Sequence, residues 1–267
     1  MMTNPLVLLF FVLFGLIIGS FLNALIYRLP RELSIVHGNS LCPSCGHRLY
    51  AVDLVPLFSW ALLRGKCRYC HEPISPRYPA VEAINAALYL AVGLRFGLTL
   101  EALASAILCS SLLAIAVIDW QEMLIPDSLC VAVAVAGVLL LVSGSGAVSP
   151  RDRLIGAFCV SVPLLLIALV SRGRAMGGGD IKLMAALGLC LGWKLTLLTT
   201  LSGAVLGTLV VLLLRRTRFA LGREVPFGCF LAIAGIAVLF GGEAFLGWYL
   251  GLLVHHHHGP DCTCQLG

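Results

Sequence analysis

The chain has 267 residues, of which 60% are hydrophobic and only 12% are charged, with a mean hydropathy of +1.00. Because a soluble domain usually carries about 25% charged residues, this composition excludes an ordinary soluble protein and indicates an integral membrane protein. The formal net charge of +5 is not accompanied by a recognisable nucleic-acid-reading motif. We therefore expect membrane topology, and no nucleic-acid partner, to explain the excess of positive charge.

The apolar runs predict an all-α polytopic protein with about eight membrane-spanning helices, since each span needs roughly 20 apolar residues. The predicted spans are Leu6–Tyr27, Ala80–Phe96, Leu100–Ile118, Asp127–Ser145, Leu154–Val170, Ile181–Gly192, Leu195–Leu214 and Phe227–Val254. The sixth run is short, so residues 181–214 could instead form one bent or re-entrant unit. No basic residue precedes the first run, which favours a permanent span over a cleaved signal peptide.

Basic residues are concentrated in three of the predicted loops. Segments 28–79, 171–180 and 215–226 hold most of the Lys and Arg residues and share one side of an eight-span path. Basic loops face the cytoplasm. We therefore expect these three segments to be cytoplasmic and both termini to face outward.

The one sizeable polar insertion covers residues 30–79, between the first two spans. It contains Cys42-Pro43-Ser44-Cys45 and, after 21 further residues, Cys67-Arg68-Tyr69-Cys70. Two such knuckles at this separation are typical of a tetrahedral four-cysteine zinc site, which is closed and therefore structural. We expect the metal to supply most of the folding energy of so small a segment. Two disulfides or a redox pair are alternatives, but the reducing cytoplasmic side and the repeated motif disfavour them.

Other metal-ligating residues receive plainer interpretations. His47 and His71 follow the knuckles and are expected to be surface or supporting residues, because four thiolates already complete a zinc site. Single cysteines in or beside the apolar runs are expected to be packing residues: Cys109, Cys130, Cys159, Cys190 and Cys229. Residues 255–267, with His255–His258, Cys262 and Cys264, resemble a tag or polar tail. The chain is thus predicted to divide into the first span (1–29), the four-cysteine segment (30–79), the remaining spans (80–254) and the tail (255–267).

Two aspartates are the strongest candidates for chemistry. Asp119 ends the apolar run 105–118, and Asp180 follows Gly177, Gly178 and Gly179. A carboxylate at bilayer depth costs about 2.5–3.5 kcal/mol on insertion scales and therefore suggests function. The topology places both at the cytoplasmic boundary, where two nearby carboxyls cannot easily both ionise and would share one proton. The ionised member can activate water, while the protonated one polarises a scissile carbonyl.

The neighbouring acids have simpler alternatives. Asp127 follows Pro126 and is expected to be the N-cap of the next helix, and Glu122 a solvated loop residue. Asp180 could likewise be the N-cap of a helix over 181–192, preceded by glycines that can take positive φ or let a peptide approach. From the spacing alone, this capping role remains open beside a catalytic one.

Ordered motifs around these residues resemble the bacterial prepilin peptidases, a family of intramembrane aspartic proteases with a Gly-x-Gly-Asp motif. The motifs are Gly19-Ser20-Phe21-Leu22-Asn23, Tyr27-Arg28-Leu29-Pro30, the two cysteine knuckles, Ile74-Ser75-Pro76-Arg77-Tyr78-Pro79 with Glu82, Ile118-Asp119 to Pro126-Asp127, Gly177-Gly178-Gly179-Asp180-Ile181-Lys182-Leu183 and Pro226-Phe227-Gly228. They follow one another over about residues 19–230, and their order is more specific than any one of them.

The resemblance implies that the basic leader of type IV prepilins or pseudopilins is cleaved at the cytoplasmic face of the bacterial inner membrane. The family's two essential aspartates match Asp119 and Asp180, with Gly177–Gly179 and Lys182 in the supporting loop. Members with the cysteine-rich loop typically also N-methylate the new terminal residue from S-adenosylmethionine, and serve the type IV pilus or type II secretion machinery. Glu82 could attract the basic leader or pair with Arg77 or a neighbouring loop arginine.

Two positions depart from the family pattern. Gln121 stands where another acid is common, and Cys229 stands where proline is common; neither is expected to touch the catalytic pair. A proton-coupled transporter with relay carboxylates is a rival hypothesis, although no convincing inverted repeat supports it. A non-enzymatic scaffold that docks a partner through the zinc knuckle is another, but it leaves the Gly-Gly-Gly-Asp loop unused.

Overall fold

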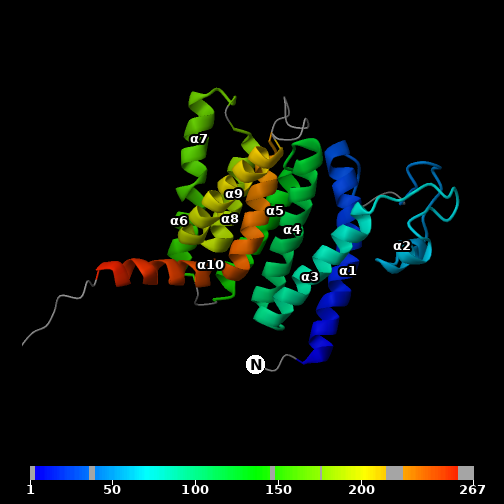
Figure 1. Cartoon of the computed structure of the whole chain (residues 1–267), viewed down its shortest axis with the longest axis horizontal. Helices are drawn as coiled ribbons and strands as arrows, with labels where there is room; N and C mark the ends of the chain where they lie inside the picture. The colour runs from blue at the N-terminus through cyan, green and yellow to red at the C-terminus, as the bar shows by residue number, and fades with distance from the viewer. Residues whose placement is uncertain (1–3, 36–39, 145–147, 175, 215–224, 258–267) are drawn as a thin grey trace, which may run out of the picture.

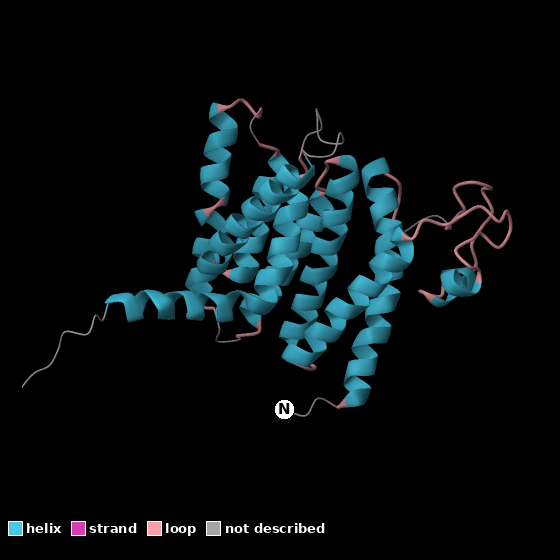
Figure 2. Cartoon of the chain, in the orientation of Figure 1, coloured by secondary structure: helices cyan, strands magenta, loops and turns pink. Residues whose placement is uncertain are grey.

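The computed structural model describes residues 4–35, 40–144, 148–174, 176–214 and 225–257. These residues are predominantly helical and contain no strand; their β-structure consists of two isolated bridges, Leu41 with Arg48 and Lys66 with Pro73 (Figure 2). The expected all-α class is therefore confirmed. The tail residues 258–267 and most of the basic loop at 215–226 lie outside the described residues.

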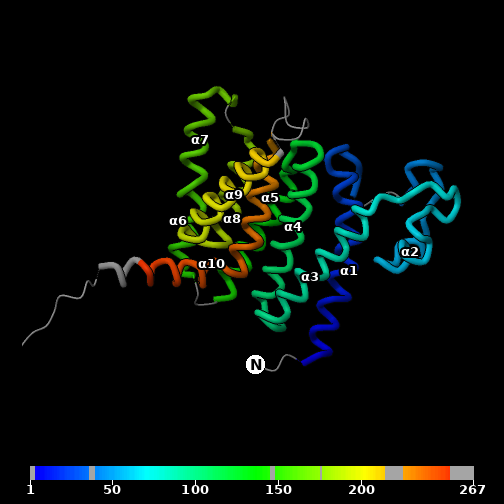
Figure 3. Tube along the Cα trace, viewed as in Figure 1, coloured from blue at the N-terminus to red at the C-terminus, as the bar shows by residue number. Residues whose placement is uncertain are grey.

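The helices follow one another through a bundle, with a small polar segment to one side (Figures 1 and 3). They are α1 (Pro5–Arg28), α2 (Phe58–Leu62), α3 (Arg77–Phe96), α4 (Leu100–Glu122), α5 (Asp127–Val142), α6 (Pro150–Cys159), α7 (Ser161–Val170), α8 (Gly178–Leu191), α9 (Trp193–Leu214) and α10 (Phe227–His257), with 3-10 turns η1 (Leu29–Arg31) and η2 (Ala51–Leu54).

The core is built around α4, which packs against α1, α3, α5 and α10. Leu108, Leu112, Ile115 and Ile118 are fully buried along this helix. By contrast, large apolar side chains are exposed along α1, α7 and α9, for example Leu13, Leu166 and Leu209. An apolar exterior around an apolar core is what a lipid solvent permits.

Among the described residues, five helices are long and apolar enough to cross a membrane, so the expected count of eight is not confirmed. They are Pro5–Arg31, Leu100–Glu122, Pro150–Val170, Trp193–Leu213 and Phe227–Leu252. Of the other three expected spans, α5 and α8 have only 16 and 14 residues. The third, α3, carries buried Glu82 and Asn85 on the face that packs against α1. A short helix such as α8, whose apolar side chains are mostly buried, can lie inside a bundle because protein, not lipid, surrounds it.

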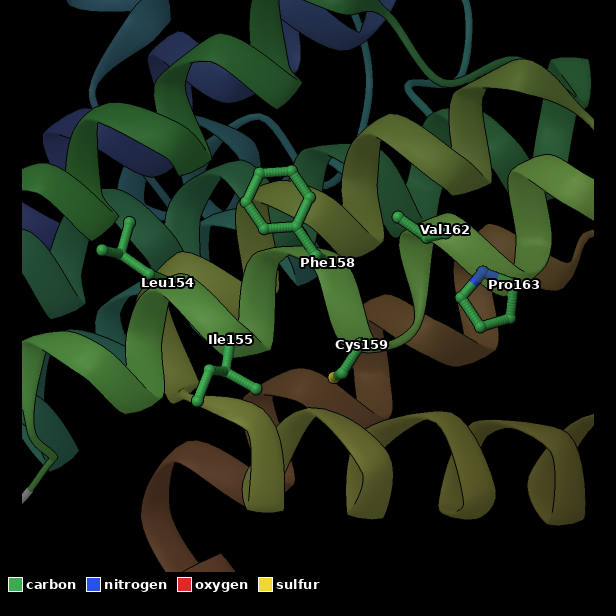
Figure 4. Close-up of a pocket in the computed structure, with 6 residues that line it drawn as sticks. All are labelled: Leu154, Ile155, Phe158, Cys159, Val162 and Pro163. Carbon is green, nitrogen blue, oxygen red and sulfur yellow. The ribbon is translucent and has the colours of Figure 1, made fainter.

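The span over Pro150–Val170 is interrupted between α6 and α7. Pro163 cannot donate a backbone hydrogen bond to the preceding turn, which explains a break at Val160. Figure 4 shows an apolar hollow at this break, lined by Leu154, Ile155, Phe158, Cys159, Val162 and Pro163. Because Cys159 is its only ionisable side chain, this hollow offers little for acid–base chemistry.

Residues 181–214 form two helices that a break at Gly192 separates. Gly192 ends α8 with φ of 77°, and α9 begins at the next residue. The ends that matter for function are α4's last turn and the first turns of α5, α8 and α10, which meet at one end of the bundle (Figure 1). The fold thus gathers four helix ends around the two aspartates.

Candidate active site and metal site

Asp119 lies in the last turn of α4 and is only 5% exposed. Its Oδ2 accepts the backbone N–H of Cys229 at 2.7 Å and interacts with the N–H of Gly228, both in the first turn of α10. The first amides of a helix have no partner within the helix and carry partial positive charge. The start of α10 therefore holds Asp119 in place and favours its ionised form.

Asp180 lies at the third position of α8, whose N-cap is Gly177. The alternative that Asp180 caps this helix is therefore wrong. Its Oδ1 is buried and has no hydrogen-bond partner among the described residues. Asp119 and Asp180 are close enough to interact electrostatically. A buried carboxyl oxygen without a partner, beside a second carboxylate, is costly unless it serves a ligand or a proton.

Ile125, in the link between α4 and α5, packs between the two halves of the site. A Cβ added to Gly179 would lie 2.9 Å from Cβ of Ile125, and one added to Gly228 would lie 3.1 Å from Asp119 Oδ2. Glycine at these positions therefore allows three helix ends to converge. Gly178 has open space on its Cβ side, and none of the three glycines before Asp180 takes positive φ. Open space at Gly178 and close packing at Gly179, not left-handed backbone, are what this glycine run provides.

Asp127 and Lys182 form an ion pair beside the aspartates. Both Asp127 carboxylate oxygens lie 2.8 Å from Lys182 Nζ. The N-cap of α5 is Pro126, and Asp127 makes no capping hydrogen bond, so the expected capping role is wrong. Lys182 instead draws that carboxylate toward α8 and fastens α5 to α8. Glu122 is exposed as expected, but it ends α4 and pairs with Arg31 at 3.6 Å.

The two residues that depart from the family pattern, Gln121 and Cys229, each form a defined contact in the structure. Gln121 Oε1 accepts a hydrogen bond from Arg77 Nη1, which links α4 to α3. Cys229 does touch the carboxylate pair, contrary to expectation, because its N–H is bound to Asp119. A proline at that position would have no N–H to donate. Sequence reasoning missed this contact because a backbone donor leaves no signature in side-chain identity.

An apolar groove runs along the outside of α4 next to Asp119. Cys229 contributes to both, since its side chain lines the groove and its N–H binds Asp119. The lining residues come from α3, α4, α9 and α10: Arg77, Ile84, Leu88, Leu113, Ala116, Val117, Trp120, Gln121, Val210, Cys229, Phe230, Ile233 and Ile236. The groove is apolar along the spans and polar only at the end nearest Asp119.

Glu82 forms no ion pair with Arg77 or another arginine among the described residues. It is 8% exposed, and its Oε2 accepts the backbone N–H of Leu57 at 2.8 Å. Its Cα lies against Gly19 of α1, where a Cβ would approach to 2.8 Å. Glu82 thus attaches the segment at 30–79 to α3.

The four knuckle cysteines come together in the polar segment. The sulfur atoms of Cys42, Cys45, Cys67 and Cys70 all lie within 4.8 Å of one another, and those of Cys42 and Cys70 are 3.9 Å apart. A tetrahedral zinc ion with bonds of about 2.3 Å would hold its sulfurs about 3.8 Å apart. The cysteines are free thiols, so the disulfide alternative is not supported. The cluster fits a metal ion.

Each knuckle is a short hairpin with the same backbone pattern. Cys42 donates its N–H to His47 O and accepts the N–H of Gly46, and Cys67 repeats this with Glu72 and His71. The His47 ring lies against the Tyr69 ring, with centroids 3.6 Å apart and planes tilted by 32°. Both histidines are exposed and neither joins the four-sulfur group, in agreement with the expected surface or supporting role.

Asp53 connects the second knuckle to the linker between the two hairpins. Although burial acts in the opposite direction, hydrogen bonds from Arg68 and from the Tyr50 N–H and Tyr69 hydroxyl lower the pKa of Asp53. The Arg68 Nε–Asp53 Oδ1 distance is 2.6 Å. This small network orders the segment around the metal site.

Comparison with known proteins gives two family matches. Residues 13–96 match the bacterial peptidase A24 N-terminal domain, and residues 106–212 match the type IV leader peptidase family. The chain belongs to the type IV leader peptidase family. The first match contains all four knuckle cysteines, and the second contains both Asp119 and Asp180.

Curated relatives of this leader peptidase family are similar over nearly their whole length. Proteins named prepilin leader peptidase/N-methyltransferase from Aeromonas hydrophila, Pseudomonas putida and Bacillus subtilis are 37%, 39% and 35% identical to the chain. The alignments cover 89%, 86% and 89% of this chain and 92%, 90% and 96% of the relatives. No solved structure gives a significant match.

Proposed function

We propose that the chain is a membrane aspartic endopeptidase that removes the basic leader of type IV prepilins or pseudopilins and N-methylates the new terminal residue. The observation that carries this proposal is the pair of interacting aspartates at one end of the bundle, one of them with an unpartnered buried oxygen. The names of the relatives, which combine the two activities, support it.

Unequal surroundings assign the two carboxyls different roles. Asp119 receives backbone N–H bonds on Oδ2, which Asp180 lacks, so it is the member of the pair better suited to be the ionised general base that takes a proton from a water molecule. Asp180 holds the shared proton and donates a hydrogen bond to the scissile carbonyl oxygen. Water oxygen bonds to the carbonyl carbon, then the carbon–nitrogen bond breaks and the leaving amine takes a proton from the pair.

The apolar groove beside Asp119 provides a place for the substrate. A prepilin has a basic leader followed by a hydrophobic helix, which can stay in the bilayer while the junction reaches the carboxyls. The groove wall is apolar along α3, α4 and α10 and ends next to the Cys229 N–H that binds Asp119. Open space at Gly178 leaves room for extended peptide on the other side of the pair.

We also propose the full topology, with eight passes through the inner membrane and the carboxyls and knuckles on the cytoplasmic side. In this arrangement α8 is an inner pass, packed against α5, α6, α7 and α9, whereas α3 and α5 each present exposed apolar side chains on one side. The division into 1–29, 30–79, 80–254 and 255–267 follows from it. Basic residues in loops on the side of Asp119 support the orientation.

In this proposal the knuckle cysteines hold a structural zinc ion, with Cys42, Cys45, Cys67 and Cys70 as its ligands. Four thiolates leave no open coordination position, so the ion contributes folding energy and not catalysis. S-adenosylmethionine is the methyl donor, and its methyl group is transferred to the amine that cleavage releases. Pilus or type II secretion machinery would receive the processed subunit.

The proposed chemistry is tested by cleavage of a prepilin in detergent or nanodiscs. Asp119→Asn and Asp180→Asn each remove one carboxyl without changing side-chain volume, and we expect losses of at least about 10²–10⁴-fold. Glu122→Gln is the matched control, because Glu122 lies one turn from Asp119 and pairs with Arg31 outside the site. Cleavage near the wild-type rate by either aspartate variant would exclude this mechanism.

Methylation is tested separately by incubating the cleaved product with labelled S-adenosylmethionine. Label on the new terminal amine is the expected result. If cleavage proceeds but no label appears, the second activity is absent from this chain and the peptidase assignment stands.

A further inference from the structure

The short helix α2 presents an apolar face to its surroundings. Phe58 is 64% exposed and Leu62 is 83% exposed, and exposed Ala61 lies between them on the same face. The polar side-chain atoms of the other face form hydrogen bonds within the cysteine-containing segment. Trp60 Nε1 donates to Ile74 O at 3.2 Å, and Ser59 Oγ donates to Val55 O at 2.8 Å. The helix is thus fixed with its apolar side outward.

The preceding turn enlarges this surface. Val52, Leu54 and Val55, in and just after η2, are also exposed. We call Val52, Leu54, Val55, Phe58 and Leu62 the α2 patch. Contiguous exposed apolar side chains of this kind usually mark contact with a protein or a membrane.

The depth of α2 relative to the spans is set by Glu82. Leu57, the residue before α2, donates its N–H to Glu82 Oε2 at 2.8 Å. Glu82 lies five residues after Arg77, the start of α3, which corresponds to about 7 Å along the helix axis. It packs on Gly19, nine residues before Arg28 at the end of α1. The start of α2 therefore lies alongside the spans instead of beyond their ends, and Figure 1 shows α2 at this level.

Polar and aromatic side chains mark the membrane boundary at the ends of the same helices. Arg77 is bonded to Gln121, Arg31 pairs with Glu122, and Trp120 is 51% exposed. Aromatic and basic residues gather at the headgroup level of membrane proteins. The α2 patch begins below this level, on the bilayer side.

Two cations flank the patch. Arg64 and Lys66 follow α2 directly, and both are exposed. Within the described part of the chain, neither forms an ion pair. A short apolar face bordered by Lys and Arg matches the pattern of segments that bind anionic lipid surfaces.

We propose that the cysteine-containing segment docks on the bilayer through the α2 patch, with Phe58 and Leu62 among the acyl chains and Arg64 and Lys66 at anionic headgroups. Interfacial helices bury their apolar face about 5–10 Å below the headgroup boundary, which agrees with the depth set by Glu82. A partner protein or a second copy would have to reach that depth through lipid. The docking fixes the height of the metal site above the two aspartates.

Photo-crosslinking of the full chain in phosphatidylglycerol-containing nanodiscs tests the docking. Benzoylphenylalanine replaces Leu62 or, as the matched control, Leu41, an equally apolar residue that is 57% exposed in the first knuckle. We expect lipid adducts at least about tenfold more abundant from position 62, because only there does the side chain meet acyl chains. Equal lipid labelling at both positions, or adducts at position 62 only with protein, would overturn the proposal.

Trypsin provides an independent measurement. In the docked state the bonds after Arg64 and Lys66 face headgroups, so Leu62→Asp is expected to accelerate cleavage there severalfold, and Leu41→Asp is not. Metal content of both variants is measured first, since a variant that has lost its metal has lost the fold of the segment. If Leu62→Asp keeps its metal and is cut at the wild-type rate, the α2 patch does not hold the segment to the bilayer.

Discussion

The helical bundle and the cysteine-containing segment are ordered by different means. In the bundle, α4 and α8 bury continuous apolar surface, and each functional side chain is fixed by helices that converge from distant parts of the chain. In the segment at 30–79, Cys42 and Cys67 are the only buried hydrophobic residues among those described. Two small hairpins bring their sulfurs together instead.

This contrast explains where function can be placed. A packed bundle can hold an unpartnered carboxyl oxygen at Asp180, because the surrounding helices remain ordered without it. The small segment has too little buried apolar surface to stay ordered in this way. It depends on the metal held by its cysteines and on attachments such as the Glu82–Leu57 hydrogen bond. Loss of metal should therefore unfold the small segment and leave the bundle folded.

The largest predicted effect is metal removal. Structural zinc contributes about 10–16 kcal/mol in small domains, so chelation or Cys67→Ser is expected to unfold residues 40–74 while the bundle stays helical. Protease mapping and circular dichroism would report the two regions separately. Cys159→Ser is the matched control, because Cys159 lies in the bundle. If chelation leaves the segment as protease-resistant as before, metal does not hold it together.

The second prediction concerns the bundle. Gly156 of α6 and Gly188 of α8 meet backbone to backbone, so a side chain at Gly188 would collide with Gly156 O. Gly188→Leu is expected to destabilise the bundle by at least about 3 kcal/mol, because backbone cannot move aside as a side chain can. Thermal unfolding in detergent measures this loss. Gly247→Leu, where α10 has open space, should be nearly neutral, and zinc content should be unchanged in both.

Much of this comparison could be read from the sequence. The cysteine spacing predicted the four-sulfur cluster, because each tight turn directs its two sulfurs toward one metal position. The apolar runs predicted the helices and the ordered motifs predicted the family. The two catalytic candidates remain predictions, although the structure brings Asp119 and Asp180 within electrostatic reach.

What the sequence could not provide depends on backbone placement. Asp127 resembled an N-cap, but Lys182 from a helix more than fifty residues later takes its carboxylate. Glu82 resembled a partner for a basic residue, but its partner is the Leu57 N–H. The count of eight spans is not confirmed, because α5 and α8 have only 16 and 14 residues and their passage through the bilayer depends on their surroundings, not on their length alone.

The third prediction concerns the network inside the segment. Asp53→Asn keeps the shape of the side chain but weakens the contacts with Arg68, and we expect a loss of about 1 kcal/mol because Arg68 is half exposed. The pKa of Asp53 is lower in the folded state, so its contribution is full above the ordinary aspartate pKa and disappears as pH falls through the lowered value. Zinc competition near neutral pH, where the thiolates can hold the metal, should show the full difference between wild type and variant. Equal zinc retention by the two proteins there would contradict this account.

The smallest predicted effect distinguishes the two knuckles from each other. Gly46 and His71 occupy equivalent positions, each donating its N–H to the first cysteine of its knuckle, and both have left-handed backbone with φ of 69° and 59°. Left-handed backbone costs a residue with a Cβ about 1–2 kcal/mol, and glycine avoids this cost. Glycine is more flexible in the unfolded state, however, so ordering it costs about 0.5–1 kcal/mol more than ordering another residue. We therefore expect His71→Gly to strengthen zinc retention by at most about 1 kcal/mol, measured against a competing chelator. Gly46→Ala, which meets no atom within 4 Å and tests backbone strain alone, should weaken it by a similar amount. If His71→Gly weakens retention instead, the His71 side chain contributes more to the second knuckle than its backbone costs, and the two hairpins are not equivalent.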